Sequence, residues 1–83
     1  MKEYDRVRLT SPLEAGTVID PVTIPAGTEG IIVDAFPGES IRRASYEVDF
    51  TLREPVWGPN DEVLVAGRYE NATAHDDNLE LVG

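Results

Sequence analysis

Short stretches in which apolar and polar residues alternate recur along this chain, and such alternation is typical of β-strands that bury one face. Residues 5–9 place Val7 and Leu9 on one face of an extended segment and two arginines on the other. Tyr46–Phe50 shows the clearest alternation in the chain. Residues 28–36 are rich in β-branched side chains and stop at a Pro-Gly pair, which is typical of a central strand. The pattern predicts a small all-β protein.

Segments rich in Gly, Pro and Asp separate these strands. Residues 10–23 have no sustained period and predict a long surface loop. The Gly-Pro-Asn-Asp turn at residues 58–61 predicts an extended hairpin near residues 51–66, whose return strand begins at about Val63. Residues 75–78 predict one helical or 3₁₀ turn before a final strand that ends near Val82. No segment shows a helical period of ten residues.

The inward positions of these strands define the expected core. With 83 residues the chain can build only one thin core, so the whole of it is expected to form a single domain. Gly30 lies within a strand, and a glycine there predicts a bulge or a close approach of another backbone. The predicted core residues are Val7, Leu9, Ile32, Val48, Phe50, Val63, Val65, Leu79 and Leu81.

Five strands, a long first loop, a Gly-x-x-Gly strand entry at residues 27–30 and a helical turn before the last strand together resemble a small SH3-like barrel. Residues 4–9, 25–34, 46–50 and 77–82 are similar to the bacterial domain-of-unknown-function family 4926, and they cover less than half of the chain. The strand pattern also resembles the KOW modules of ribosomal and transcription proteins. The family resemblance implies a five-stranded SH3-like barrel without catalytic residues. It also implies an immunity or antitoxin role, because such proteins are thought to lie beside toxin-like genes.

Composition narrows the classes of function. The chain has no cysteine, so neither a disulfide framework nor a thiolate metal site is available. A catalytic zinc needs about three protein ligands, and His75 is the single histidine. Ser11, Ser40 and Ser45 are surrounded by no nucleophile motif. Glu47 and Asp49 share one strand face and are interpreted as a solvated surface. We therefore expect no enzyme activity, no metal and no cofactor.

The chain is acidic and its charge is unevenly distributed. Sixteen Asp and Glu residues against seven Lys and Arg residues give a net charge of −9. Residues 1–45 hold five basic and seven acidic residues (−2), and residues 46–83 hold two and nine (−7). No apolar stretch approaches the ~18 residues of a membrane span, and the charged start is unlike a signal peptide, so a cytoplasmic protein without membrane contact is expected.

Concentrated charge of one sign accelerates association with a partner of opposite charge, although it also serves solubility. Trp57 and Tyr69 flank the predicted hairpin, and each is either an interface anchor or a part of the core. Together these features predict a surface that binds a basic protein. Its candidate residues are Glu54, Trp57, Asp61, Glu62, Tyr69, Glu70, Asp76 and Asp77.

The leading hypothesis is a non-enzymatic, acidic protein-binding domain, most concretely an immunity or antitoxin-like inhibitor of a basic toxin or nuclease. A mobile-element inhibitor that mimics nucleic acid, such as an anti-CRISPR protein, would have the same composition.

A KOW-like nucleic-acid module and a structural subunit of an enzyme complex are alternatives from other classes. The net charge argues against nucleic acid. A basic patch of Arg6, Arg8, Arg42 and Arg43 would require the loop after Pro37 to fold over the first strand. The protein is expected to be a monomer or a small homo-oligomer.

Overall fold

The structure is a computed structural model that describes residues 1–83. It consists of short strands and a single 3₁₀ turn, and no helix in it has the length or apolar character needed to cross a bilayer. The elements are β1 (Arg6–Leu9), β2 (Leu13–Gly16), β3 (Pro21–Ile24), β4 (Glu29–Phe36), β5 (Ser45–Arg53), β6 (Val56–Trp57), β7 (Val63–Val65), β8 (Arg68–His75), η1 (Asp76–Asn78) and β9 (Leu79–Leu81).

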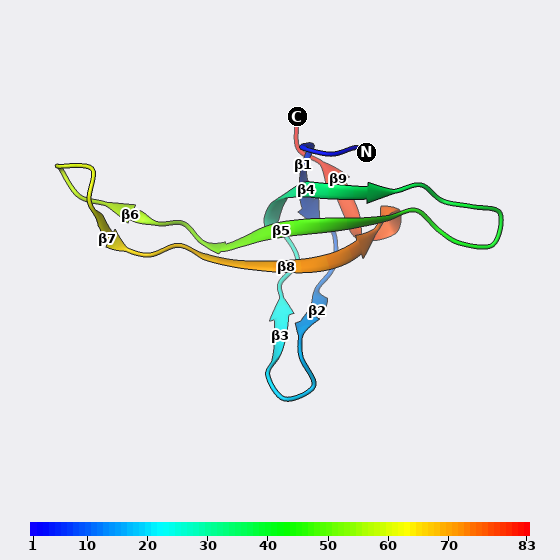
Figure 1. Cartoon of the computed structure of the whole chain (residues 1–83), viewed down its shortest axis with the longest axis horizontal. Coiled ribbons are helices and arrows are strands. Elements are labelled where there is room, and N and C mark those ends of the chain that lie inside the picture. The colour runs from blue at the N-terminus through cyan, green and yellow to red at the C-terminus, as the bar shows by residue number, and fades with distance from the viewer.

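Five strands form one antiparallel sheet in the order β8-β5-β4-β1-β9 (Figure 1). Two two-stranded ribbons, β2–β3 and β6–β7, project from it in different directions. The molecule is therefore long and flat, with extents of 52 × 33 × 18 Å. The prediction of an all-β protein is confirmed. The sheet is not a closed barrel, because β8 pairs only with β5 and β9 pairs only with β1.

Residues 10–23, predicted as a surface loop, contain most of a hairpin, so that prediction was wrong. β2 and β3 pair from Leu13↔Ile24 to Gly16↔Pro21. The turn is closed by Thr17, whose side-chain oxygen accepts a hydrogen bond from the backbone N–H of Asp20 at 2.9 Å. The strands are only four residues long, which is too short for their alternation to be distinguished from a loop.

The predicted hairpin near residues 51–66 is present. β5 and β8 pair along most of their length, and beyond Arg53 the chain continues as the β6–β7 ribbon. The predicted turn before the last strand is also present as η1. It begins after His75, whose backbone N–H donates to Asn78 Oδ1 at 3.0 Å. The last strand, β9, is three residues long.

The core lies under the centre of the sheet and contains ten buried side chains. Six predicted core residues are among them, and these are Val7, Leu9, Ile32, Val48, Phe50 and Leu79. Val63, Val65 and Leu81 were predicted wrongly and are exposed, because the β6–β7 ribbon and the end of β9 extend past the core. Sequence analysis missed four buried residues, which are Ile24, Tyr46, Ala72 and Ala74.

Gly30 lies where three strands come closest. It pairs with Val7 on one side and Phe50 on the other. A Cβ atom at this position would lie 2.7 Å from the backbone oxygen of Asp49 and 2.8 Å from a methyl group of Val48. The predicted close approach is confirmed. The register shift in β4 lies two residues further on, between Ile32 and Asp34.

Replacing Gly30 with valine should destabilise the protein, because the new side chain would overlap backbone atoms that have no free rotation. Overpacking of this kind costs about 1–3 kcal/mol or more. Urea unfolding should show that loss. Gly83→Ala is the matched control, since a Cβ atom there meets nothing within 4 Å. A Gly30→Val protein as stable as the parent would refute the packing role of this glycine.

Candidate functional site

The charged side chains on the outer face of the sheet are arranged unevenly. Tyr46, Val48 and Phe50 point into the core, so the residues between them, Glu47 and Asp49, lie on the outer face. The register shift after Ile32 brings Asp34 of β4 directly opposite Glu47 of β5. Three carboxylates therefore lie side by side on two neighbouring strands.

These carboxylates bond only to neutral groups. The side-chain amide of Asn71 donates to Asp49 Oδ1 at 2.8 Å, and the hydroxyl of Thr73 donates to Glu47. Asp34 Oδ1 accepts the backbone N–H of Ala35 at 3.0 Å. No Lys or Arg side chain lies within 4.0 Å of any of the three. Like charges directly opposite each other destabilise an antiparallel pair, so the fold carries this arrangement at a cost.

The other half of the same face is neutralised. Arg8 of β1 lies between two carboxylates and contacts Glu29 and Glu80, each at 3.2 Å. Its hydrogen bonds to Glu80 and Glu29 raise the pKa of Arg8 above its ordinary value. Arg6 lies 4.0 Å from Glu29. The uncompensated negative charge is therefore confined to the β4–β5–β8 side of the sheet.

A fourth carboxylate adjoins this region across an open hollow of about 410 Å³ between β2 and β8. Glu14 and Glu47 both line the hollow, together with Asn71 and Thr73. Glu14 accepts a hydrogen bond from the hydroxyl of Thr23 at 2.9 Å, again a neutral donor. We call the carboxylates of Glu14, Asp34, Glu47 and Asp49 the acidic face.

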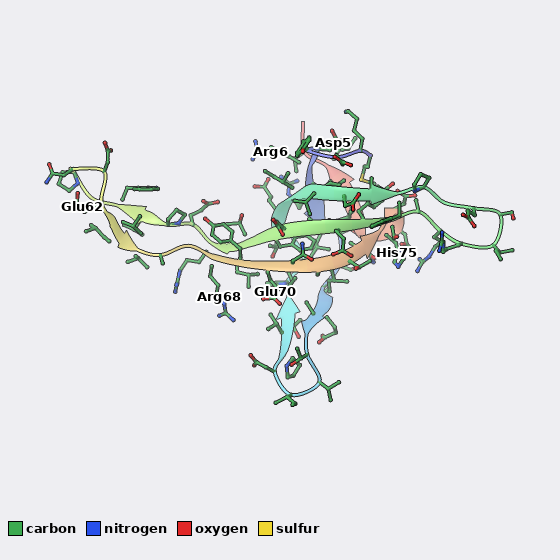
Figure 2. All side chains as sticks on the ribbon, in the orientation of Figure 1. Asp5, Arg6, Glu62, Arg68, Glu70 and His75 are labelled. Atoms are coloured by element: carbon green, nitrogen blue, oxygen red, sulfur yellow. The ribbon has the colours of Figure 1, made fainter.

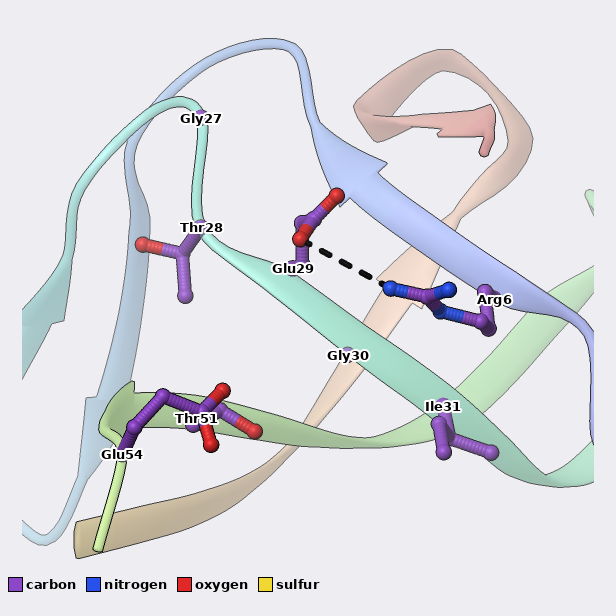
Figure 3. Close-up of a pocket in the computed structure, with 8 residues that line it drawn as sticks. All are labelled: Arg6, Gly27, Thr28, Glu29, Gly30, Ile31, Thr51 and Glu54. Atoms are coloured by element: carbon purple, nitrogen blue, oxygen red, sulfur yellow. Dashed lines mark ion pairs between the residues drawn. The ribbon is translucent and has the colours of Figure 1, made fainter. Parts of the chain in front are cut away.

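A second open hollow, of about 330 Å³, lies over the start of β4, between Arg6 of β1 and the end of β5 (Figure 3). It contains the paired side chains of Arg6 and Glu29, and Glu54 at its rim. Thr28 and Thr51 add hydroxyl groups, and one apolar side chain lines it. It offers polar contacts for a partner, and neither threonine hydroxyl donates a hydrogen bond to Glu29 or Glu54. Across the whole chain, no three His, Asp or Glu side chains are placed to hold a metal ion.

The structure separates the eight site residues predicted from the sequence into two groups. Figure 2 shows Glu62 near the far end of the β6–β7 ribbon, Glu70 on β8 near the middle of the molecule, and His75, which precedes η1, at the opposite end of β8 from the ribbon. Glu54, Trp57, Asp61, Glu62, Tyr69 and Glu70 belong to the first group, and Asp76 and Asp77 belong to the second.

Within the first group the side chains do not share one face. Tyr69 pairs with Thr51 on the outer face, whereas Glu70 pairs with Phe50 on the core side and is half-buried. Trp57 is 60% exposed and lies outside the core. Glu62 shapes the turn, since its side chain accepts the backbone N–H of Asn60 at 2.9 Å.

The second group is occupied by bonds within the chain. The hydroxyl of Tyr46 donates to Asp76 Oδ1 at 2.6 Å, and Arg43 forms an ion pair with Asp77 at 2.7 Å. These contacts attach η1 to β5 and to the loop before it. Asp77 therefore already has a basic partner within the chain, whereas Asp76 and the carboxylates of the acidic face bond to neutral donors.

Sequence analysis counted Glu47 and Asp49 in the acidic half but did not place Glu14 or Asp34 beside them. The alternation around Val48 was sufficient to show that Glu47 and Asp49 face outward. The position of Asp34 depends on the register shift after Ile32, which no feature of the sequence marks. Glu14 comes close through the hairpin that was read as a loop.

A comparison of the chain with protein-family models, with curated proteins and with solved structures finds no match. The residues themselves must therefore support any functional conclusion.

The bond between Tyr46 and Asp76 makes stability depend on pH in the alkaline range. This hydrogen bond and burial raise the pKa of Tyr46 to about 12. An unfolded tyrosine loses its proton at about pH 10, so between pH 10 and 12 the unfolded state binds fewer protons and the stability falls as pH rises. Urea unfolding at several pH values should show this fall, and Tyr46→Phe should flatten it. An equal pH dependence in Tyr46→Phe would contradict the assignment.

Proposed function

We propose that this chain is a non-enzymatic binding domain that captures a basic protein on its acidic face. The observation that carries the proposal is the row of Asp34, Glu47 and Asp49, which lies without a basic partner while the arginines of β1 have theirs. Like charges that lie opposite each other destabilise the sheet. Their presence is explained if a binding partner supplies the missing cations. Basic side chains of a partner would relieve that repulsion, and they would find hydrogen-bond acceptors already aligned.

The most concrete form of this function is an immunity or antitoxin-like inhibitor of a basic toxin or nuclease. Such an enzyme has a positively charged cleft for nucleic acid, and a flat acidic sheet resembles the charge of that substrate. The order of the five strands, the long first hairpin and the 3₁₀ turn before the last strand support an SH3-like scaffold whose sheet remains open.

The arginines give little support for nucleic acid as the partner. Arg6, Arg8, Arg42 and Arg43 each contact a carboxylate of this chain, at 4.0, 3.2, 3.4 and 2.7 Å. Binding to a phosphate backbone depends on cations that are free to replace counterions. A basic patch made of these four residues would first have to break its own ion pairs.

Affinity capture with neutralised variants tests the proposal. Asp34→Asn, Glu47→Gln and Asp49→Asn together change the net charge from −9 to −6 and keep an oxygen at each hydrogen bond. Glu3→Gln, Asp20→Asn and Glu39→Gln make the same change of charge at exposed positions away from the acidic face. Immobilised parent and control proteins should retain a basic protein from an extract of the source organism, and the acidic-face variant should retain much less.

The retained protein, once purified, gives the decisive kinetics. Its association rate with the parent should fall about tenfold or more between roughly 50 and 500 mM salt, with a smaller effect on dissociation. If it is a toxin or nuclease, the parent chain should lower its activity. Equal capture by both variants, an acidic partner, or tight binding of a generic RNA in place of protein would overturn the proposal.

A further inference from the structure

The β6–β7 ribbon is an arm that extends beyond the core. We define the arm as residues 54–67, between the end of β5 and the start of β8, and it forms the end of the molecule farthest from η1 (Figure 1). None of its side chains belongs to the core or packs against it. At about 3.3 Å per residue, the seven steps along the chain from Arg53 to Asn60 span roughly 23 Å.

Both faces of the arm are apolar. Val56 pairs with Val65 and Trp57 pairs with Val63, with a register shift that leaves Leu64 unpaired. Alternation places Val56 and Trp57 on opposite faces of β6, and it places Leu64 on the face of β7 opposite to Val63 and Val65, so both faces of the ribbon carry apolar side chains. Tyr69 adds a further apolar surface where the arm joins β8. These side chains have no covering within the chain.

The charges at the two ends of the arm are opposite. At its base Arg53 and Arg68 are direct cross-strand partners. They are the two of the seven Lys and Arg residues that have no carboxylate within 4.0 Å. Glu54 follows Arg53 in the chain, so two arginines and one glutamate give the base a net charge of +1. At its tip lie Asp61 and Glu62, which form no ion pair either. Figure 2 shows Arg68 at the base and Glu62 near the tip.

We propose that the arms of two copies of this chain pack against each other in opposite directions, about a twofold axis. In this arrangement the carboxylates of Asp61 and Glu62 in each copy meet the guanidinium groups of Arg53 and Arg68 in the other. Between the two ends, the apolar side chains on the facing sides of the two arms bury each other. This interface is self-complementary, as a twofold axis requires.

The same charges exclude arms that point in the same direction, since tip would then meet tip and base would meet base. Opposed arms also keep the two acidic sheets apart. The separation of roughly 23 Å along the arm exceeds the Debye length of about 8 Å at physiological salt, so the net charge of −9 on each copy is largely screened.

Contact through side chains fits the arm better than strand pairing at its edge. Pro55 and Pro59 flank β6, and a proline has no N–H to donate to a neighbouring strand. The six exposed apolar side chains present roughly 600 Å² per copy over both faces of the ribbon, and packing through one face buries only part of this area, which is less than the total of about 1,200 Å² in a standard specific interface. The dimer should therefore dissociate on dilution. The six residues are Val56, Trp57, Val63, Leu64, Val65 and Tyr69.

Sedimentation equilibrium of the full chain tests the dimer at about 150 mM salt, where the Debye length is about 8 Å. The mass should rise from 9.1 kDa towards twice that value as the concentration increases to about 1 mM, a range suited to a small interface. Trp57 is the single tryptophan, and its emission should shift to shorter wavelength over the same range. Val63→Ser with Leu64→Ser should weaken the dimer at least tenfold.

The control for the apolar variant is Ile41→Ser, because Ile41 is 95% exposed in the loop between β4 and β5, outside the arm. This variant should dimerise like the parent. A parent chain that stays at 9.1 kDa throughout, or an Ile41→Ser protein that loses the dimer as fully as the arm variant, would overturn the proposal.

Charge exchange tests the direction of the arms. Arg53→Glu with Arg68→Glu makes the base negative, and Asp61→Asn with Glu62→Lys makes the tip positive. Asparagine is used at position 61 because Asp61 has a φ of 62°, which asparagine tolerates. Each double variant alone should be monomeric. An equimolar mixture of the two should recover a heterodimer, since each tip then meets a base of opposite charge.

Circular dichroism of each double variant shows that it remains folded. Failure of the folded mixture to associate, or dimerisation of either variant alone as strong as that of the parent, would contradict the opposed packing. None of these substitutions touches the acidic face, so this test and the capture experiment can fail independently.

Discussion

Gly30 on β4 lies between Val7 of β1 and Phe50 of β5, and the close contact of these three strands holds the sheet together. The missing side chain leaves room for Val48 and Phe50, which would otherwise meet a Cβ atom at 3.0 Å or less. The core formed around this contact has only ten side chains. It stabilises the centre of the sheet, includes Ile24 from the β2–β3 hairpin, and leaves the β6–β7 ribbon to extend into solvent.

The alternation that builds the core also builds the acidic face. Each inward residue of β5 is followed by an outward one, so the strand that contributes Val48 and Phe50 necessarily presents Glu47 and Asp49 to solvent. The arginines that neutralise the neighbouring strands lie on β1 and do not reach these carboxylates. Repulsion between like charges is often found on surfaces that bind a partner, because binding and not stability determines which residues lie there.

The exposed apolar residues follow from the small size of the core. Val63 and Val65 belong to an apolar run that is typical of a buried strand. They are exposed because the hairpin extends beyond the core, and a sequence pattern does not show how far a hairpin extends. Their exposure, and that of Trp57, is the reason for the proposed contact between two arms. The acidic face and the arm lie on different parts of the sheet, and one chain can therefore present two interfaces.

Much of the sheet could be predicted from the sequence, because residues 46–50 and 79–81 alternate clearly and Gly30 marks a close approach. The β2–β3 hairpin could not, since its strands are four residues long and contain Gly16 and Pro21 at their ends. Closure of the barrel was expected from the resemblance to SH3-like domains. Whether the edge strands β8 and β9 meet depends on long-range geometry that local patterns do not record.

The candidate site was predictable in its charge but not in its position. The excess of acidic residues after position 45 predicts a site between Glu54 and Asp77, whereas Glu47 and Asp49 of β5 are interpreted from the sequence as a solvated surface. Asp76 and Asp77 lie in the same acidic half, yet Tyr46 and Arg43 bind them within the chain, and such pairing across distant segments is invisible in the sequence. The register shift that brings Asp34 beside Glu47 is equally hidden, because it depends on how two strands pair.

Repulsion between the carboxylates of the acidic face should lower the stability of the protein. Urea unfolding of Glu47→Gln at low salt is the most direct test of this cost. Glutamine keeps an oxygen for the hydroxyl of Thr73 and removes the charge that lies opposite Asp34. If the repulsion is real, this variant should be more stable than the parent by about 0.2–1 kcal/mol, and the gain should shrink as salt screens the charges. Glu3→Gln, at an exposed position without a partner, should show no such gain. A Glu47→Gln protein of equal or lower stability would contradict the account of the acidic face given above.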